Sequence, residues 1–138
     1  MNEQFPRVGV GVYVIKNGKV LLGRRKNSHG AGTWSSPGGK LELKETPLDC
    51  GVRETLEEAG VEVQNVRFLG FTNDLDTEDN THWITLAYSA DWKAGEARIM
   101  EPDKCSEWSW FAWDNLPEPL YLSTRNFVNS AYNPFNEI

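Results

Sequence analysis

The chain has 138 residues, the usual size of one domain, and its 39% hydrophobic and 25% charged residues are typical of a globular protein. A net charge of −6 argues against a nucleic-acid-binding surface, which is normally basic. No apolar run is long enough to cross a bilayer, and the polar N-terminus lacks the pattern of a signal peptide. We therefore expect a single cytoplasmic domain over residues 1–138, with no nucleic-acid or membrane partner.

The chain opens with the pattern of a β-hairpin. Alternating valines predict a strand over residues 8–15. Asn17-Gly18 follows, a dipeptide typical of tight hairpin turns, and it predicts a returning strand from 19 to 24 or 25. The turn-forming residues of segment 27–33 then predict a mobile loop.

A helix over residues 47–59 is the most clearly marked element. Thr46 is a good N-cap, Pro47 suits the first helical position, and Asp49 completes a variant of the capping box. Gly60 is the residue type that commonly ends a helix in the left-handed conformation.

The remaining patterns complete a layered fold. They predict strands over 66–72, 83–89 and 107–113 and a second helix near 120–131. Strands interrupted by helices, after an early hairpin, predict an α/β (α+β) sandwich in which helices cover both sides of a mixed sheet.

The predicted helix concentrates acidic residues on one face. Glu54, Glu57 and Glu58 are spaced so that their carboxylates project from a single turn. Like charges repel at this spacing, whereas a hard divalent cation such as Mg²⁺ would bind them. Arg53 lies beside the cluster, and Glu45 could accept its guanidinium in a bidentate pair. The ordinary alternative is a solvated acidic face.

A longer pattern surrounds this helix. GX5EX7REUXEEXGU, with U an apolar residue, spans residues 39–61 and is matched by Gly39, Glu45, Arg53, Glu54, Glu57, Glu58 and Gly60. Thr55 departs from it, because it stands where the pattern prefers an apolar residue. Thr55 points away from the acidic face, so we expect a minor packing effect. The pattern is the Nudix box, and the chain resembles the Nudix hydrolases.

The resemblance implies an α/β/α sandwich and an enzyme that hydrolyses a nucleoside diphosphate linked to another group, using Mg²⁺ or Mn²⁺. It implies that Glu57 and Glu58 bind metal, that the Gly39 carbonyl adds an oxygen ligand, and that Glu54 is a metal ligand or the general base. It also implies that Arg53 and its partner glutamate orient the loop against the helix.

The substrate class is suggested by segments outside the box. LLGRRKNSHGAGTW at 21–34, the Pro-Gly-Gly before the box and EPDKCSEWSW at 101–110 resemble the small nucleoside-triphosphate diphosphatases that clean nucleotide pools. This resemblance implies conversion of an NTP or dNTP to the monophosphate plus diphosphate. The alternatives are hydrolysis of ADP-ribose or another nucleoside diphosphate derivative, and a non-catalytic nucleotide-sensing module. The complete set of box carboxylates argues against the module.

Further ligands should come from outside the helix. One helical turn cannot fill a coordination sphere, and we expect Glu101, rather than Asp103 or Glu107, to supply another metal ligand. Arg25 is the candidate for a phosphate contact, with a solvated basic turn as the alternative.

Aromatic residues could hold the base. We expect Trp34 and the Tyr121-Leu122 segment to offer stacking surface and tolerant base choice, while a place in the core is the alternative for both aromatics.

Several other residues are expected to be structural. We interpret four aromatic residues as core or a homodimer interface: Trp108, Trp110, Phe111 and Trp113. We place His29 on a loop surface and His82 at a strand start. Cys50 and Cys105 fit no zinc spacing and are predicted to be free, buried thiols.

Overall fold

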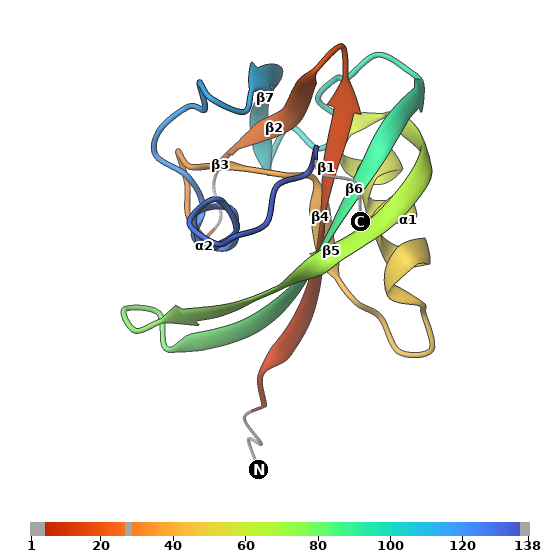
Figure 1. Cartoon of the computed structure of the whole chain (residues 1–138). Coiled ribbons are helices and arrows are strands. Elements are labelled where there is room, and N and C mark those ends of the chain that lie inside the picture. The colour runs from red at the N-terminus through yellow and green to blue at the C-terminus, as the bar shows by residue number, and fades with distance from the viewer. Residues whose placement is uncertain (1–4, 27–28, 136–138) are drawn as a thin grey trace.

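A computed structural model describes residues 5–26 and 29–135 and shows a seven-stranded mixed sheet with two helices (Figure 1). The elements are β1 (Arg7–Lys16), β2 (Lys19–Arg25), β3 (Trp34–Ser35), β4 (Gly38–Lys40), α1 (Pro47–Ala59), β5 (Glu62–Asp76), β6 (Thr81–Ala94), β7 (Cys105–Ala112) and α2 (Leu122–Val128).

The strands run in the order β3-β2-β1-β6-β5, while β4 also pairs with β1 and β7 with β2. The β1–β6 pair is parallel and every other pair is antiparallel. The predicted mixed sheet is therefore confirmed. The early hairpin is confirmed too, since β1 and β2 flank the Asn17-Gly18 turn.

The two helices cover opposite sides of the sheet (Figure 1). On β1, Val12 and its alternate neighbours pack with Cys50 and Ala59 of α1. Tyr13 points the other way and packs with Phe127 of α2. Because side chains alternate along a strand, β1 contributes to both hydrophobic cores, and the predicted sandwich follows.

Helix α1 begins and ends where its capping residues predict. The Thr46 hydroxyl accepts a hydrogen bond from the Asp49 amide at 3.2 Å, and Gly60 has φ 72°. Thr55 is fully buried, and its hydroxyl donates to the Gly51 carbonyl at 2.7 Å within the same helix. The polar departure from the box is thus satisfied locally, as its position on the helix suggested.

Other boundaries differ from the predicted ones. Strands β5 and β6 extend beyond 66–72 and 83–89. Three register shifts interrupt the pairing in the first half of β5, and polar residues at 72–74 interrupt the hydrophobic pattern in its second half. Helix α2 is shorter than 120–131, because Leu120 still forms a bridge with Trp34 and Tyr121 is the N-cap.

The predicted loop is described only in part, because Asn27 and Ser28 lie outside the described residues. Residues 29–32 form turns, and the Gly32 amide donates to the Arg25 carbonyl at 2.8 Å. The predicted mobility of this loop stays a prediction.

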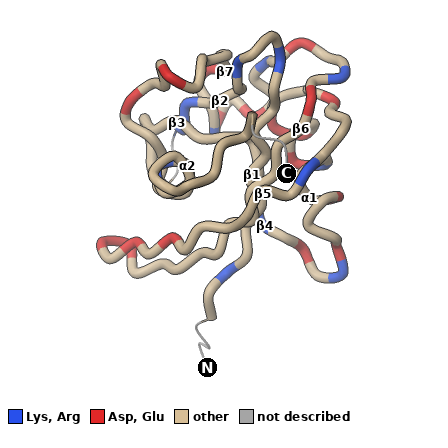
Figure 2. The backbone as a smooth tube through the Cα atoms, viewed as in Figure 1, with Lys and Arg blue, Asp and Glu red and all other residues tan. Residues whose placement is uncertain are grey.

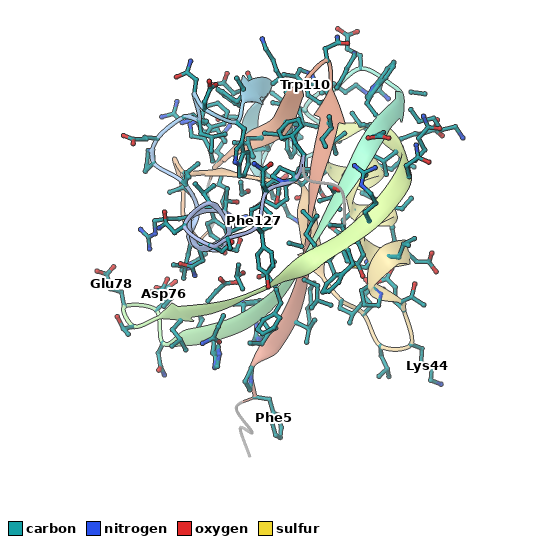
Figure 3. The ribbon with its side chains drawn as sticks, in the orientation of Figure 1. Phe5, Lys44, Asp76, Glu78, Trp110 and Phe127 are labelled. Atoms are coloured by element: carbon teal, nitrogen blue, oxygen red, sulfur yellow. The ribbon has the colours of Figure 1, made fainter. Side chains whose placement is uncertain are left out.

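The aromatic residues of the last strand contribute to both cores. Trp108 and Trp110 pack against the α1 side, whereas Phe111 and Trp113 pack against the α2 side (Figure 3 labels Trp110). Both cysteines are free and buried, as predicted. The described part of the chain has no helix that is long and apolar enough to span a membrane.

Candidate active site

Two glycines bring the backbone of β4 against the acidic face of α1. The Gly38 amide donates to Glu58 Oε1 at 2.7 Å. A Cβ at Gly38 would overlap the Val10 carbonyl, and a Cβ at Gly39 would overlap the Glu54 carboxyl. Because the overlap at Gly38 is with backbone, only glycine there allows the approach that places β4 next to the carboxylates of the helix.

Arg53 joins the preceding loop to the acidic face. Its guanidinium forms a bidentate pair with Glu45, at 2.7 Å from Nε to Oε2 and 3.0 Å from Nη2 to Oε1. Its Nη1 also donates to Glu54 at 2.7 Å and to Glu57 at 3.1 Å. Hydrogen bonding to Arg53 lowers the pKa of Glu45 to about 2. The predicted pair is present, and it also holds two of the three helix carboxylates.

Glu58 is a largely enclosed acid. Its pKa is raised to about 8, mainly by desolvation and also by the charges of Glu54 and Glu101, while the Gly38 amide and Arg25 oppose the shift. Burial also raises the pKa of Glu54. Among the residues that the structure describes, Glu58 has no basic side chain in ion-pair contact.

This environment fits a divalent cation. Burying a carboxylate without a compensating charge is unfavourable, and Mg²⁺ or Mn²⁺ would supply that charge. The donors that meet here are carboxylate oxygens and the backbone beside Gly39, which are the hard ligands that Mg²⁺ prefers. The residues present therefore fit the metal that the box implies.

The raised pKa predicts how the metal-free protein responds to pH. The Glu58 carboxyl of the unfolded chain ionises near pKa 4.5, whereas the folded protein keeps its proton up to about pH 8. Below the first value both states are protonated, and above the second both are ionised. The free energy of unfolding should therefore fall as the pH rises from the first value to the second. Outside this range, ionisation of Glu58 should change it little.

The test compares thermal unfolding of the wild type and Glu58→Gln in EDTA at pH 5, 6.5 and 8. We expect the wild-type Tm to fall relative to the variant as pH rises, and Mg²⁺ to stabilise the wild type most at pH 8. Parallel curves for the two proteins would contradict the assigned pKa.

One cavity of about 720 Å³ runs beside the acidic face, within the range of about 300–1,000 Å³ usual for small-molecule sites. Its lining contains the predicted site residues Arg25, Gly39, Arg53, Glu54, Glu57, Glu58, Glu101, Tyr121 and Leu122. Glu45 and Trp34 are not part of it. Residues that are distant in sequence thus line one cavity.

The acidic segment before β7 reaches the cavity through some of its residues. Glu101 and Asp103 both line it, whereas Glu107 is exposed on β7 opposite Arg24. The Lys104 ammonium lies 3.7 Å from Glu101. This arrangement favours Glu101 over Glu107 as an additional ligand and leaves Asp103 as its competitor.

Two aromatic candidates have different surroundings. The Arg25 guanidinium lies 4.0 Å from the centre of the Tyr121 ring, at the wall of the cavity. Trp34 is only 9% exposed and packs edge-to-face with Phe111 in the core. The structure therefore favours the core interpretation of Trp34 over a contact with the base.

His29 has partners that the sequence did not suggest. Its ring contacts Asp76 at 3.0 Å and also Asp79, both at the acidic tip of the β5–β6 hairpin (Figure 2). The run of acidic residues at 74–79 was the available clue. It could not be used, because the pairing depends on where a distant hairpin folds.

A second group of residues was missed at the cavity wall. Asp74 of β5 is 3% exposed; its Oδ2 accepts from the Thr85 hydroxyl at 2.5 Å and its Oδ1 from the Asn126 amide at 2.9 Å. Asp74 and Thr85 line the cavity. The sequence clue was an acid among the polar residues that follow the predicted strand 66–72, and no local pattern connects such an acid with the cavity.

Comparison with known proteins identifies the family. The NUDIX domain model matches residues 5–130. The chain is 31% identical to the NAD-capped RNA hydrolase NudC of Pseudomonas putida over 132 residues, which are 94% of this chain and 46% of that protein. It therefore spans about half the length of this relative.

Two further relatives are covered more completely. The chain is 33% identical to the ADP-ribose pyrophosphatase of Methanocaldococcus jannaschii over 113 residues, which are 82% of this chain and 66% of that protein. It is 34% identical to the oxidized purine nucleoside triphosphate hydrolase of Danio rerio over 125 residues, which are 85% of this chain and 80% of that protein.

Among solved structures, the MutT NUDIX hydrolase from Burkholderia pseudomallei aligns with a TM-score of 0.87 and 35% identity, over 93% of this chain and 99% of that one. This likeness in structure agrees with the sandwich fold. The family model and these similarities agree with the box: the chain belongs to the Nudix hydrolase family.

Proposed function

We propose that the protein hydrolyses a nucleoside triphosphate, ribo or deoxyribo, to the monophosphate plus diphosphate, with Mg²⁺ or Mn²⁺ as its cofactor. The observation that carries the proposal is one cavity lined by two chemically different kinds of side chain. They are the carboxylates of α1 and the aromatic side chains of Trp83 and Tyr121. A nucleotide combines the two matching chemistries, a metal-binding polyphosphate and an aromatic base.

The chain supplies ligands, orientation and charge at the phosphate part. Glu57 and Glu58, with Gly39 and Glu101, would hold the metal, which would supply Lewis-acid polarisation of the phosphoryl oxygens and a lowered pKa for a bound water. Glu54 would complete the ligand set or take the proton of the attacking water.

Two cationic side chains have separate tasks in this proposal. Arg25 would contact the phosphates from the cavity wall, where it already lies against Tyr121. Arg53 would act through its neighbours, because it orients Glu54 and fixes the loop of Glu45.

The relatives support hydrolysis of nucleotides and differ in substrate. The Danio rerio relative is named for nucleoside triphosphate hydrolysis and is covered over 80% of its length. The name of the Methanocaldococcus jannaschii relative favours ADP-ribose as the second candidate. A non-catalytic module is disfavoured, since all the box carboxylates line the cavity except Glu45, which pairs with Arg53.

The decisive measurement is hydrolysis in ¹⁸O-labelled water, with mass analysis of both products and with Mg²⁺ or EDTA. We expect a nucleoside monophosphate and diphosphate, with one ¹⁸O in one of them, and no turnover in EDTA. ADP-ribose and a dinucleoside polyphosphate serve as parallel substrates. Inorganic monophosphate as the main product, or activity confined to the parallel substrates, would overturn the proposal.

A further inference from the structure

We propose that Asp74 selects the base of the bound nucleotide and favours guanine, whose edge presents two adjacent N–H donors. This inference rests on the proposed function, because it assigns the base part of the same cavity. It also replaces the tolerant base choice expected from aromatic stacking alone.

Asp74 is a buried carboxylate with unused acceptor capacity. It is 3% exposed, and among the described residues it pairs with no cation. Each oxygen accepts one hydrogen bond, from Thr85 or from Asn126. An ionised carboxyl offers about four acceptor positions, so both oxygens can accept a further donor. A buried acceptor facing a cavity is stabilised by a ligand that donates to it.

Its neighbours hold it in one orientation. Thr85 lies on β6 and Asn126 on α2, so the carboxyl of β5 is fixed from two elements. A fixed pair of acceptors can discriminate between ligands, since a wrong partner cannot be accommodated by rotation of the side chain.

Bare backbone lies between the metal part of the cavity and the surroundings of Asp74. A Cβ placed on Gly9 would lie 3.6 Å from the Gly39 carbonyl oxygen and 3.7 Å from Thr85 Oγ1. The bare backbone of β1 therefore forms a continuous floor between the box and the residues that hold Asp74. A nucleotide whose phosphates reach the box would extend its nucleoside along this floor.

Aromatic side chains beside Asp74 favour a base over a sugar as its partner. Trp83 lies against Gly9, at 3.4 Å from the same Cβ position, and Tyr121 lines the same cavity. A base can stack on an aromatic face while its edge donates to the carboxylate, whereas a ribose offers no such face.

The chemistry distinguishes guanine from the other purines. Guanine N1–H and N2–H lie side by side and match the two oxygens of a carboxylate. Hypoxanthine lacks the second donor, and adenine places a ring acceptor against the carboxylate. In Asp74→Asn one acceptor becomes a donor, and an amide matches the N1 acceptor and N6 donor of adenine.

The experiment measures calorimetric affinities for GMP, IMP and AMP in Mg²⁺, which need no hydrolysis. We expect the wild type to bind GMP roughly 10-fold more tightly than IMP and roughly 10–100-fold more tightly than AMP. Asp74→Asn should reverse the GMP-to-AMP preference. A residue that merely supports the fold would weaken all three ligands alike.

Asp91→Asn is the matched control, since Asp91 lies on β6 outside the cavity and is 38% exposed beside Arg67. It should leave the three affinities unchanged. If Asp74→Asn does not fold, the wild-type ratios decide alone. Wild-type affinities within about threefold of one another, or an equal loss for all three ligands in Asp74→Asn, would overturn the assignment.

A deoxyribose series separates base from sugar. The same ratios for dGMP, dIMP and dAMP support base selection, whereas a preference seen only with the ribonucleotides would overturn it in favour of the sugar. Absence of triphosphate hydrolysis would refute the proposed function and leave the binding ratios as an independent result.

Discussion

Glu58→Gln is expected to lower kcat/KM for nucleotide hydrolysis by roughly 10²–10³-fold, because the metal that would stabilise the charge of the reacting phosphate loses one anionic ligand. The amide keeps the shape of the side chain and can still accept from the Gly38 amide, so the fold should survive. Glu57→Gln should act in the same direction. Initial rates at saturating Mg²⁺ measure the effect.

Glu62→Gln is the control for this pair of variants. Glu62 is an exposed carboxylate at the start of β5 and does not line the cavity, so its neutralisation changes the net charge equally without changing the site. Its activity should match the wild type. Near-normal rates in both Glu57→Gln and Glu58→Gln would refute the assigned metal site.

Arg53→Ala is expected to lower both Tm, by several degrees, and kcat/KM, by about 10–100-fold. The change removes the bidentate partner of Glu45 and leaves Glu54 and Glu57 to repel each other without a cation between them. Thermal unfolding and steady-state kinetics measure the two effects on the same preparation.

Two variants make this expectation specific. Arg53→Lys keeps the charge but cannot bind bidentately, so it should recover part of the stability and little of the rate. Arg67→Ala removes a half-exposed arginine 3.5 Å from Asp91 and should change Tm little. Unchanged stability with weakened substrate affinity in Arg53→Ala would instead identify Arg53 as a phosphate contact.

Local signals allowed the sequence to predict α1 and its carboxylates. A cap is made by residues close in sequence, so Thr46 and Gly60 mark the helix ends without knowledge of the fold. The helical period alone places Glu54, Glu57 and Glu58 on one face. The Arg53–Glu45 pair also spans few residues, and it was within reach of the same reasoning.

The opposite end of the cavity could not be predicted, because it is assembled from distant segments. Asp74 meets Asn126 across 52 positions of the chain, and no spacing rule connects them. The surroundings of Trp34 could not be predicted for the same reason. An aromatic residue near the box could stack on a ligand or enter the core, and the choice depends on its contact with the distant Phe111. The strand predicted over 66–72 also ends before Asp74, because the polar residues at 72–74 interrupt its hydrophobic pattern.

The parallel pairing of β1 with β6 has a consequence for the order of folding. Gly9 pairs with Thr85 in this register, so the whole of α1 lies within the loop of chain that the pairing closes. Closing so long a loop costs entropy before its contacts repay that cost, which makes such a pairing slow to form. The same two strands form the cavity floor that joins the carboxylates to Asp74. A nascent chain that ends before β6 can form the acidic helix but lacks the cavity floor that a nucleotide would contact. Nucleotide binding therefore requires that the sheet is complete.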